Sequence, residues 1–181
     1  DLSHWEVAFN GAEQVYHKTL DQFAEYFAPC GFRREAFRPC YGLAEATLMV
    51  MGGPKGRAPE IQHLISSGLE QNQVIISQTT GEETRTLVSC GQDVSDQKII
   101  IVDLETLTPC VADQVGEIWV SGPSVAIGYW NNPSETELTF NARLSNSGKG
   151  PFMRTGDLGF LYEGELYITG RLKDLIISDG N

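Results

Sequence analysis

The chain has 181 residues, of which 41% are hydrophobic, enough to bury one good core or two small ones. Its formal net charge of −11 argues against a nucleic-acid partner, because binding a phosphate backbone requires a basic stripe and none is visible. The sequence has no apolar run of about 18 residues and no signal-peptide pattern, so we expect no membrane span and a cytoplasmic protein.

The cysteines and the chain ends give two further expectations. The four cysteines form no C-x-x-C pair and the three histidines are scattered, so a zinc site is not indicated and we expect reduced thiols. The chain begins at Asp1 without Met and stops at Asn181, directly after a glycine. We therefore interpret it as a piece of a longer protein.

The first 53 residues predict alternating strands and helices. Residues 5–9 (WEVAF) are typical of a short strand, and Asn10-Gly11 indicates a turn after it. A helix is expected next, because four apolar residues repeat at helical spacing: Tyr16, Leu20, Phe23 and Phe27. Residues 37–41 predict a second strand, and residues 44–51 carry helix-forming side chains.

Residues 54–86 differ from their surroundings and carry no chemical motif. We expect a short helix over residues 61–69 and a strand over residues 73–77. Such an inserted element would have a small apolar patch of its own, formed by Ile61, Leu64, Ile65, Leu69, Val74 and Ile76.

From residue 87 the pattern is mostly that of strands. Strands are expected at Lys98–Val102 (KIIIV), 117–121 (EIWVS) and 125–129. Asn132, followed by Pro at the first helical position and Glu two residues later, predicts a helix that ends near residue 140. The polar stretch 141–151 predicts a loop.

The segment after this loop predicts a β-hairpin, with strands at 158–162 and 166–169 around the polar turn 163–165. Antiparallel strands bring their outer ends together, so Asp157 and Arg171 are expected to meet. A carboxylate that accepts hydrogen bonds and a guanidinium that donates them can together bind the two hydroxyls of a ribose. A simple ion pair is an equally open alternative.

Four separated motifs occur in order: FNGAEQV (9–15), YGLAEATL (41–48), GEIWVSGPSVAIGYWNNP (116–133), and RTGDL with GRLKDLI (154–158 and 170–176). As a set they resemble the AMP-forming adenylating superfamily, which includes acyl-CoA synthetases, luciferases and peptide-synthetase adenylation domains. The residues in these motifs are most similar to those of the fatty acyl-AMP ligase branch, and the resemblance covers nearly the whole chain.

This resemblance implies an α/β fold that forms part of the large N-terminal domain of an adenylate-forming enzyme. The implied divisions are a partial α/β subdomain (1–50), an inserted element (51–86), a mostly β, barrel-like subdomain (87–170) and a hinge region (171–181) that leads to a C-terminal domain. Lys173 falls at the hinge position, although a solvated lysine explains it equally well.

The implied reaction is attack of a fatty acid carboxylate on the α-phosphorus of ATP, which gives acyl-adenylate and pyrophosphate. Glu45 matches the family's catalytic, magnesium-binding glutamate, and a hard cation prefers carboxylate oxygen. The alternative is a first-turn glutamate that the helix dipole favours. ATP and Mg²⁺ are therefore the implied cofactors.

Other residues match the nucleotide-binding motifs. Tyr41 matches the aromatic that stacks on adenine, and the alternative is a core tyrosine. Asp157 resembles the carboxylate that binds the ribose hydroxyls, with Arg171 beside it, and Ile168 matches an apolar nucleoside contact or a core residue. Asn10, Gly11, Ala12 and Glu13 match the loop that edges the adenine and acyl pocket, although an ordinary strand-to-helix turn explains them equally well. The remaining matches are Gly42, Leu43 and Ala44.

Three departures or insertions refine the resemblance. Ala44 stands where most of the superfamily has Thr, and Gln14 stands where the branch usually has Pro. The extra residues at 54–86 favour the fatty acyl-AMP ligase branch, where such an insertion is thought to hinder the domain rotation needed for CoA chemistry. The implied acyl acceptor is then the phosphopantetheine arm of an acyl carrier protein.

Two other functions stay open. One is an acyl-CoA synthetase of the same superfamily. The other is a non-catalytic nucleotide-binding or interaction module. Because the family's phosphate loop and adenylation lysine are not in these 181 residues, we expect the chain alone to be inactive.

Overall fold

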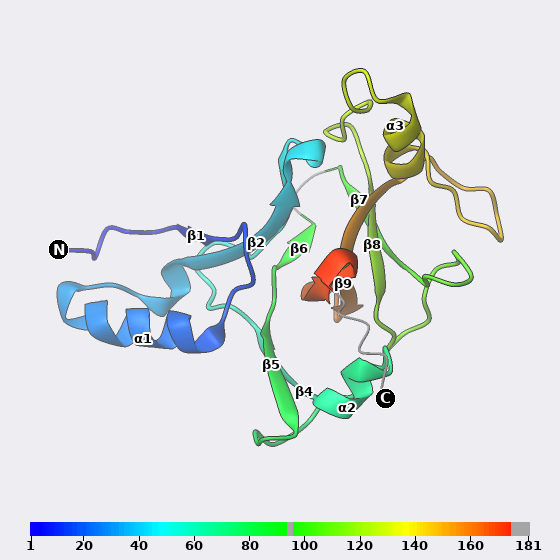
Figure 1. Cartoon of the computed structure of the whole chain (residues 1–181). Coiled ribbons are helices and arrows are strands. Elements are labelled where there is room, and N and C mark those ends of the chain that lie inside the picture. The colour runs from blue at the N-terminus through cyan, green and yellow to red at the C-terminus, as the bar shows by residue number, and fades with distance from the viewer. Residues whose placement is uncertain (94–95, 175–181) are drawn as a thin grey trace.

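The structure is a computed structural model that describes residues 1–93 and 96–174. Helices and three β-sheets are combined in it, which confirms the α/β class that the sequence predicts (Figure 1). Across the described residues, no helix is long and apolar enough to cross a membrane.

The first sheet has four strands. In spatial order they are β1 (Ala8–Asn10), β2 (Phe37–Leu43), β3 (Leu48–Gly52) and β6 (Gln92–Asp93). The first pair is parallel and the other two pairs are antiparallel. The predicted strand at 5–9 therefore forms only at its end, whereas the strand predicted at 37–41 is confirmed and extends to residue 43.

Helix α1 (His17–Phe27) connects β1 to β2, through the 3-10 turns η1 (Ala28–Cys30) and η2 (Arg34–Ala36). Its residue Leu20 is buried with Phe32 and Phe37, so the predicted apolar stripe does face the core. The stripe begins one turn later than expected, because Tyr16 precedes the helix and its side chain is exposed.

The helix predicted at 44–51 is wrong. A single 3-10 turn, η3 (Ala44–Ala46), is followed by left-handed backbone at Thr47 and Leu48, with φ of 53° and 82°. This reverses the chain, and β3 then pairs with β2 and buries Val50 and Met51. Burial of these side chains outweighs the helix propensity of the segment.

Residues 54–86 supply most of a separate two-stranded sheet, in which β4 (Ile61–Ile65) pairs with β5 (Thr84–Val88). The short helix α2 (Ser66–Glu70) begins directly after β4. The predicted helix at 61–69 is wrong for its first five residues, and 73–77 forms only isolated bridges. The patch around Leu64 and Val74 packs with Phe160 and Tyr167, so it belongs to a core shared with the hairpin.

The later strands form an antiparallel sheet. Its members in spatial order are β10 (Glu165–Arg171), β9 (Met153–Tyr162), β8 (Gly116–Ser121) and β7 (Lys98–Val102). Within residues 1–93 and 96–174 this sheet is open, with β10 and β7 at its edges. Helix α3 (Pro133–Phe140) is confirmed with Asn132 as its cap, whereas residues 125–129 form no strand.

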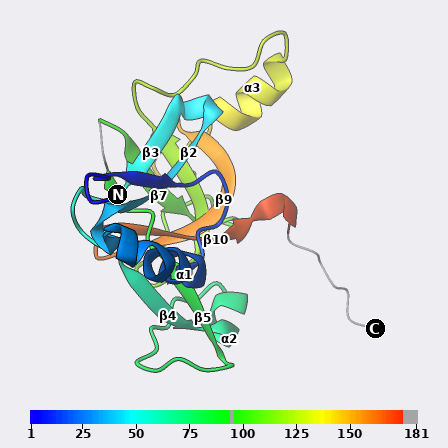
Figure 2. The same cartoon turned by 90° about the vertical axis from the view of Figure 1, so that its left-hand side faces the viewer.

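One apolar cluster joins the two larger sheets and positions the site. Tyr41, Val50 and Met51 of the first sheet pack with Ile118 and Met153 of the second. The carboxyl end of β2 is thereby brought close to the first half of β9. Figure 2 shows α1 in front of these strands, with β4 and β5 below it.

Candidate functional site

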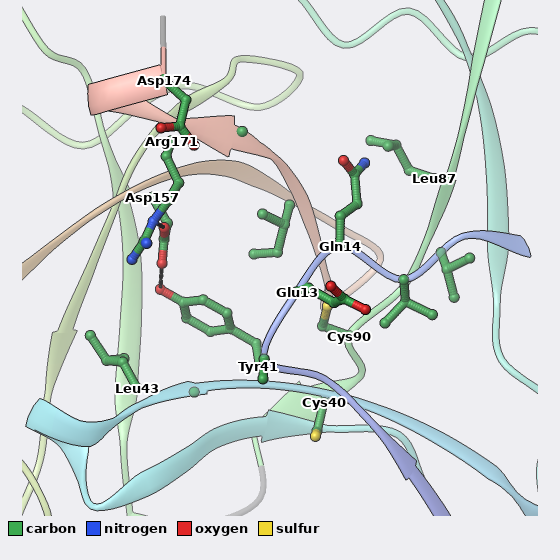
Figure 3. A pocket seen from close by; sticks show the side chains of 16 residues that line it. Glu13, Gln14, Cys40, Tyr41, Leu43, Leu87, Cys90, Asp157, Arg171 and Asp174 are labelled. Atoms are coloured by element: carbon green, nitrogen blue, oxygen red, sulfur yellow. Dashed lines mark hydrogen bonds and ion pairs between the residues drawn. The ribbon is translucent and has the colours of Figure 1, made fainter.

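Two polar side chains, one from each of the two larger sheets, meet at the carboxylate of Asp157. Arg171 lies directly opposite Asp157 in the β9–β10 ladder, and its Nε donates to Asp157 Oδ1 over 2.6 Å. The Tyr41 hydroxyl donates to the other oxygen, Oδ2, over 2.7 Å (Figure 3). The predicted meeting of Asp157 and Arg171 is confirmed, and Tyr41 joins them.

A β-bulge in β10 sets the direction of these side chains. The ladder shifts register between Ile168, which pairs with Gly159, and Gly170, which pairs with Leu158. Side chains three positions apart on a regular strand point to opposite faces, and one extra residue cancels this alternation. Ile168 and Arg171 therefore line the same cavity.

The protonation of the cluster suits donation to the carboxylate. Burial, together with the negative charge of Asp157, raises the pKa of Tyr41 well above its usual range, so the phenol keeps its proton. The hydrogen bond and charge of Asp157 also raise the pKa of Arg171. The Asp157 side chain is 10% exposed and that of Arg171 is 61% exposed, so the guanidinium remains open to a ligand.

These residues line a cavity of about 340 Å³, a size typical of small-molecule sites. Eight residues predicted as nucleotide-binding contribute to its wall: Ala12, Glu13, Tyr41, Gly42, Leu43, Asp157, Ile168 and Arg171. Sequence reasoning missed other lining residues on β2, on β5, just after β5 and on the strand-to-helix loop, among them Cys40, Leu87, Val88, Cys90, Gln14 and Val15. Gln14 and Val15 lie inside the matched motif 9–15, which could have found them, whereas Leu87 and Val88 lie in no matched motif.

Asn10 and Gly11 were predicted to edge the cavity but lie behind its wall. A Cβ at Gly11 would sit 3.0 Å from the carbonyl oxygen and the sulfur of Cys40, so Gly11 is needed for close packing. The Cys40 thiol points at the Asn10 carbonyl oxygen, 3.5 Å away. These contacts fix the loop, and Ala12, with φ of 69°, turns it into the cavity.

The close approach of β2 and β3 requires glycine at position 42. A Cβ at this position would come within 1.6 Å of the Leu48 carbonyl oxygen. The close backbone approach is therefore between β2 and β3, not toward a ligand alone. Gly42 still lines the cavity, because its other side faces the open space.

A second cavity, of about 480 Å³, adjoins the first and shares Leu43, Arg171 and Asp174 with it. Glu45 lies here, and its Oε1 accepts a hydrogen bond of 2.8 Å from the Tyr129 hydroxyl. Burial, with the hydrogen bond and charge of Glu45, raises the pKa of Tyr129 to about 12, so Tyr129 acts as the donor.

The wall of the second cavity also includes Lys173, whose side chain is exposed on η4 (Leu172–Asp174), and Arg154. Ala44 lines neither cavity. Tyr129 and Arg154 were missed as site residues although both lie inside the matched motifs. The contact of Tyr129 with Glu45 spans 84 positions, and no local pattern reveals it.

Glu45 lies in the second cavity as a candidate oxygen ligand for a metal ion. Within the described part of the chain, no three His, Cys, Asp or Glu side chains are grouped to hold an ion. A single carboxylate fits Mg²⁺, which keeps several waters and takes its other oxygens from substrate phosphates. The residues present therefore fit a cation that arrives with a nucleotide.

The structure is an α/β fold in which two adjoining cavities lie between the sheets, and a known family matches it. The AMP-binding enzyme family matches residues 1–130. The chain belongs to this family.

Two curated relatives match nearly the whole chain. The medium-chain-fatty-acid–[acyl-carrier-protein] ligase JamA of Moorena producens is 51% identical over 99% of the chain and 31% of its own length. The 4-hydroxyphenylalkanoate adenylyltransferase of Mycobacterium marinum is 45% identical over 100% of the chain and 30% of its own length. The chain thus spans about a third of these relatives.

A solved structure agrees with the computed fold. The fatty acyl-adenylate ligase from L. pneumophila, in complex with acyl adenylate and pyrophosphate, superposes with a TM-score of 0.91 at 48% sequence identity. The match covers 98% of this chain and 31% of that one.

Proposed function

We propose that this chain is part of a fatty acyl-AMP ligase, which activates a fatty acid with ATP to form an acyl-adenylate. The observation that carries the proposal is the convergence of Tyr41, Asp157 and Arg171 on one cavity that adjoins a second cavity with Glu45. The relatives that act on fatty acids support the acyl class.

The first cavity is the proposed nucleoside site. The Tyr41 ring offers a plate for adenine, and Ile168 adds an apolar contact. An ionised carboxylate has about four lone-pair sites. Tyr41 and Arg171 use one on each oxygen of Asp157, so Asp157 can still accept from both ribose hydroxyls.

The second cavity is the proposed phosphate side. Glu45 would hold Mg²⁺ there, and the ion would neutralise charge on the phosphates. Tyr129 orients the Glu45 carboxylate, and the exposed edge of Arg171 provides donors toward the α-phosphate from the shared wall. We keep Lys173 as the proposed hinge position, because it lies on the short 3-10 turn η4, directly after β10.

We propose an acyl carrier protein, rather than CoA, as the acyl acceptor, and residues 51–86 as the insertion that favours it. In support, Leu64 and Val74 of this segment are buried against Phe160 and Tyr167 of the hairpin. A segment packed into the core in this way is a fixed obstacle next to the proposed hinge. The alternative acceptor is CoA.

The test uses the L. pneumophila ligase in which the corresponding segment is replaced by these 181 residues, hereafter the exchange ligase. We expect ATP–pyrophosphate exchange that depends on a fatty acid, and its loss by at least about a hundredfold in Glu45→Gln. Tyr129→Phe, which leaves the Glu45 carboxylate in place, is the milder companion variant. A folded exchange ligase without this activity would contradict the proposal.

The acceptor is tested separately, by supplying the exchange ligase with a phosphopantetheinylated carrier protein or with CoA. Acyl transfer to the carrier with little thioester on CoA supports the carrier. Efficient CoA thioester formation supports an acyl-CoA synthetase instead. The 181-residue chain alone is expected to form no acyl-adenylate, since it spans only 31% of the ligase relative.

A further inference from the structure

The buried carboxylate of Glu117 is the centre of a hydrogen-bond network that the proposed function has not used. Glu117 lies on β8 and its side chain is only 2% exposed. It accepts from Trp119 Nε1 at 2.9 Å and from the Gly156 backbone N–H at 3.1 Å. It also accepts from Arg154 Nε at 3.0 Å and lies 2.7 Å from Arg154 Nη2.

These contacts fix the orientation of the Arg154 guanidinium. Nε and Nη2 both contact Glu117 Oε2, and Nε also reaches Oε1 at 3.3 Å, so two nitrogens of the group are held and its plane is set as well as its position. The Trp119 ring lies against it, with the guanidinium carbon 5.7 Å from the ring centre. Because Nε and Nη2 are turned to Glu117, the Nη1 amino group is left for a further acceptor.

The pair is buried on one side and open on the other. The Arg154 side chain is 37% exposed, and Arg154 and Glu117 both line the second cavity with Glu45. Replacement of a buried ion pair by apolar residues is often neutral or stabilising, so stability alone gives a weak reason for this arrangement. A donor held rigidly at the wall of a cavity gives a stronger one.

The same network fixes the part of β9 that carries Asp157. Gly156 has φ of 70°, and its N–H is bound by Glu117. Thr155 donates to the Ile118 carbonyl at 2.7 Å and accepts from the Asp157 N–H at 3.1 Å. Glu117 thus connects the wall of the second cavity to the carboxylate of the first.

We propose that Arg154 binds a phosphate group of the nucleotide in the second cavity and that Glu117 positions it, a role that rests on the function proposed above. Arg171 is likewise paired with the buried Asp157, so the wall of the second cavity carries two guanidinium groups, each paired with a buried carboxylate. Because each arginine is already paired, it contributes oriented N–H donors rather than uncompensated charge.

The experiment compares ligands with and without phosphates in the exchange ligase. The Glu117→Gln/Arg154→Gln double variant removes both charges together and leaves no unpaired buried carboxylate. We expect its affinity for α,β-methylene-ATP to fall by about tenfold or more. Its affinity for adenosine should change by less than about twofold, because glutamine at position 117 keeps an amide oxygen that accepts from the Gly156 N–H and so holds the Asp157 segment. The KM for ATP should rise while the KM for the fatty acid stays constant.

Glu6→Gln/Lys55→Gln is the matched control, because this surface pair lies outside both cavities. We expect it to leave both affinities unchanged. Arg154→Lys keeps the positive charge next to Glu117 but lacks the planar guanidinium with its several N–H donors. It should weaken α,β-methylene-ATP binding by about threefold or more, and it serves as the test if the double variant does not fold.

The outcomes separate the two proposals. An unchanged ratio of α,β-methylene-ATP affinity to adenosine affinity in the double variant or in Arg154→Lys, even with a lower melting temperature, would show a purely structural pair and overturn this inference. Failure of the unmutated exchange ligase to bind both adenosine and α,β-methylene-ATP would instead overturn the proposed function.

Discussion

Tyr41 and Asp157 are 116 positions apart, and the hydroxyl of one donates to the carboxylate of the other over 2.7 Å. Tyr41 lies on β2 of the first sheet and Asp157 on β9 of the second. Both are buried, so the bond is shielded from water. The bond connects the two larger sheets at the wall of the first cavity. It also holds the aromatic ring of Tyr41 and the carboxylate of Asp157 in a fixed position relative to each other.

The first prediction separates the ring of Tyr41 from its hydroxyl. Tyr41→Phe keeps the plate and should retain affinity for a non-hydrolysable acyl-AMP mimic within about threefold in the exchange ligase. Tyr41→Leu loses the aromatic face and should weaken binding by roughly tenfold or more, since stacking on a base contributes about 1–3 kcal/mol. Isothermal titration calorimetry measures both, and equal affinities of the two variants would exclude the stacking role.

The second prediction concerns the ribose hydroxyls. The exchange ligase should bind adenosine about tenfold more tightly than 2′,3′-dideoxyadenosine, because hydrogen bonds to a charged acceptor contribute about 1.5–3 kcal/mol. Asp157→Asn should remove most of this preference and leave the affinity for the dideoxy ligand nearly unchanged.

A matched variant for this test is Ile168→Val, which lies in the same cavity and has no polar contact to the sugar. It should keep the preference for adenosine. An Asp157→Asn variant that still discriminates between adenosine and its dideoxy form would show that Asp157 only holds Arg171 in place.

The hairpin was predictable from sequence because its determinants are local. Alternating side chains, a polar turn and antiparallel geometry together require that Asp157 and Arg171 meet, and they do. The cap of α3 is equally local, with the Glu135 N–H bound to the Asn132 side chain.

The failures come from contacts between distant segments. Residues 44–51 carry helix-forming side chains, but Val50 and Met51 are buried against the second sheet, and β3 forms instead. Likewise, β4 is completed by β5, about twenty residues further along the chain. The bulge between Ile168 and Gly170 decides which side chains line the cavity, and its one sequence signal is the glycine inside the strand, which the prediction did not use.

The third prediction tests why position 42 is glycine. Gly42→Ala would place a Cβ 1.6 Å from the Leu48 carbonyl oxygen, which is backbone and cannot rotate away. We expect the free energy of unfolding to fall by about 2–3 kcal/mol or more, measured by urea denaturation of the 181-residue chain. Gly170→Ala is the control in the same cavity, because its Cβ would meet no atom within 4 Å. Equal losses in the two variants would refute the packing explanation.

The fourth prediction concerns alkaline pH. Burial is the main cause that raises the pKa of Tyr167 from 10.0 to about 12. Between these values the unfolded chain has lost the phenolic proton while the folded chain retains it. The folded state then binds more protons than the unfolded state, so the free energy of unfolding falls as pH rises. The stabilisation is complete below pH 10 and lost as pH approaches 12.

Tyr167→Phe isolates this contribution. The ring should keep its stacking on Phe160, at 5.1 Å between centroids, because only the hydroxyl is removed. The loss of unfolding free energy between pH 10 and 12 should be smaller than in the unmutated chain, by on the order of 2 kcal/mol. Tyr26→Phe, at a side chain 77% exposed, controls for the loss of a phenol. Urea unfolding at stepped pH measures all three, and identical slopes for Tyr167→Phe and the unmutated chain would contradict the assignment.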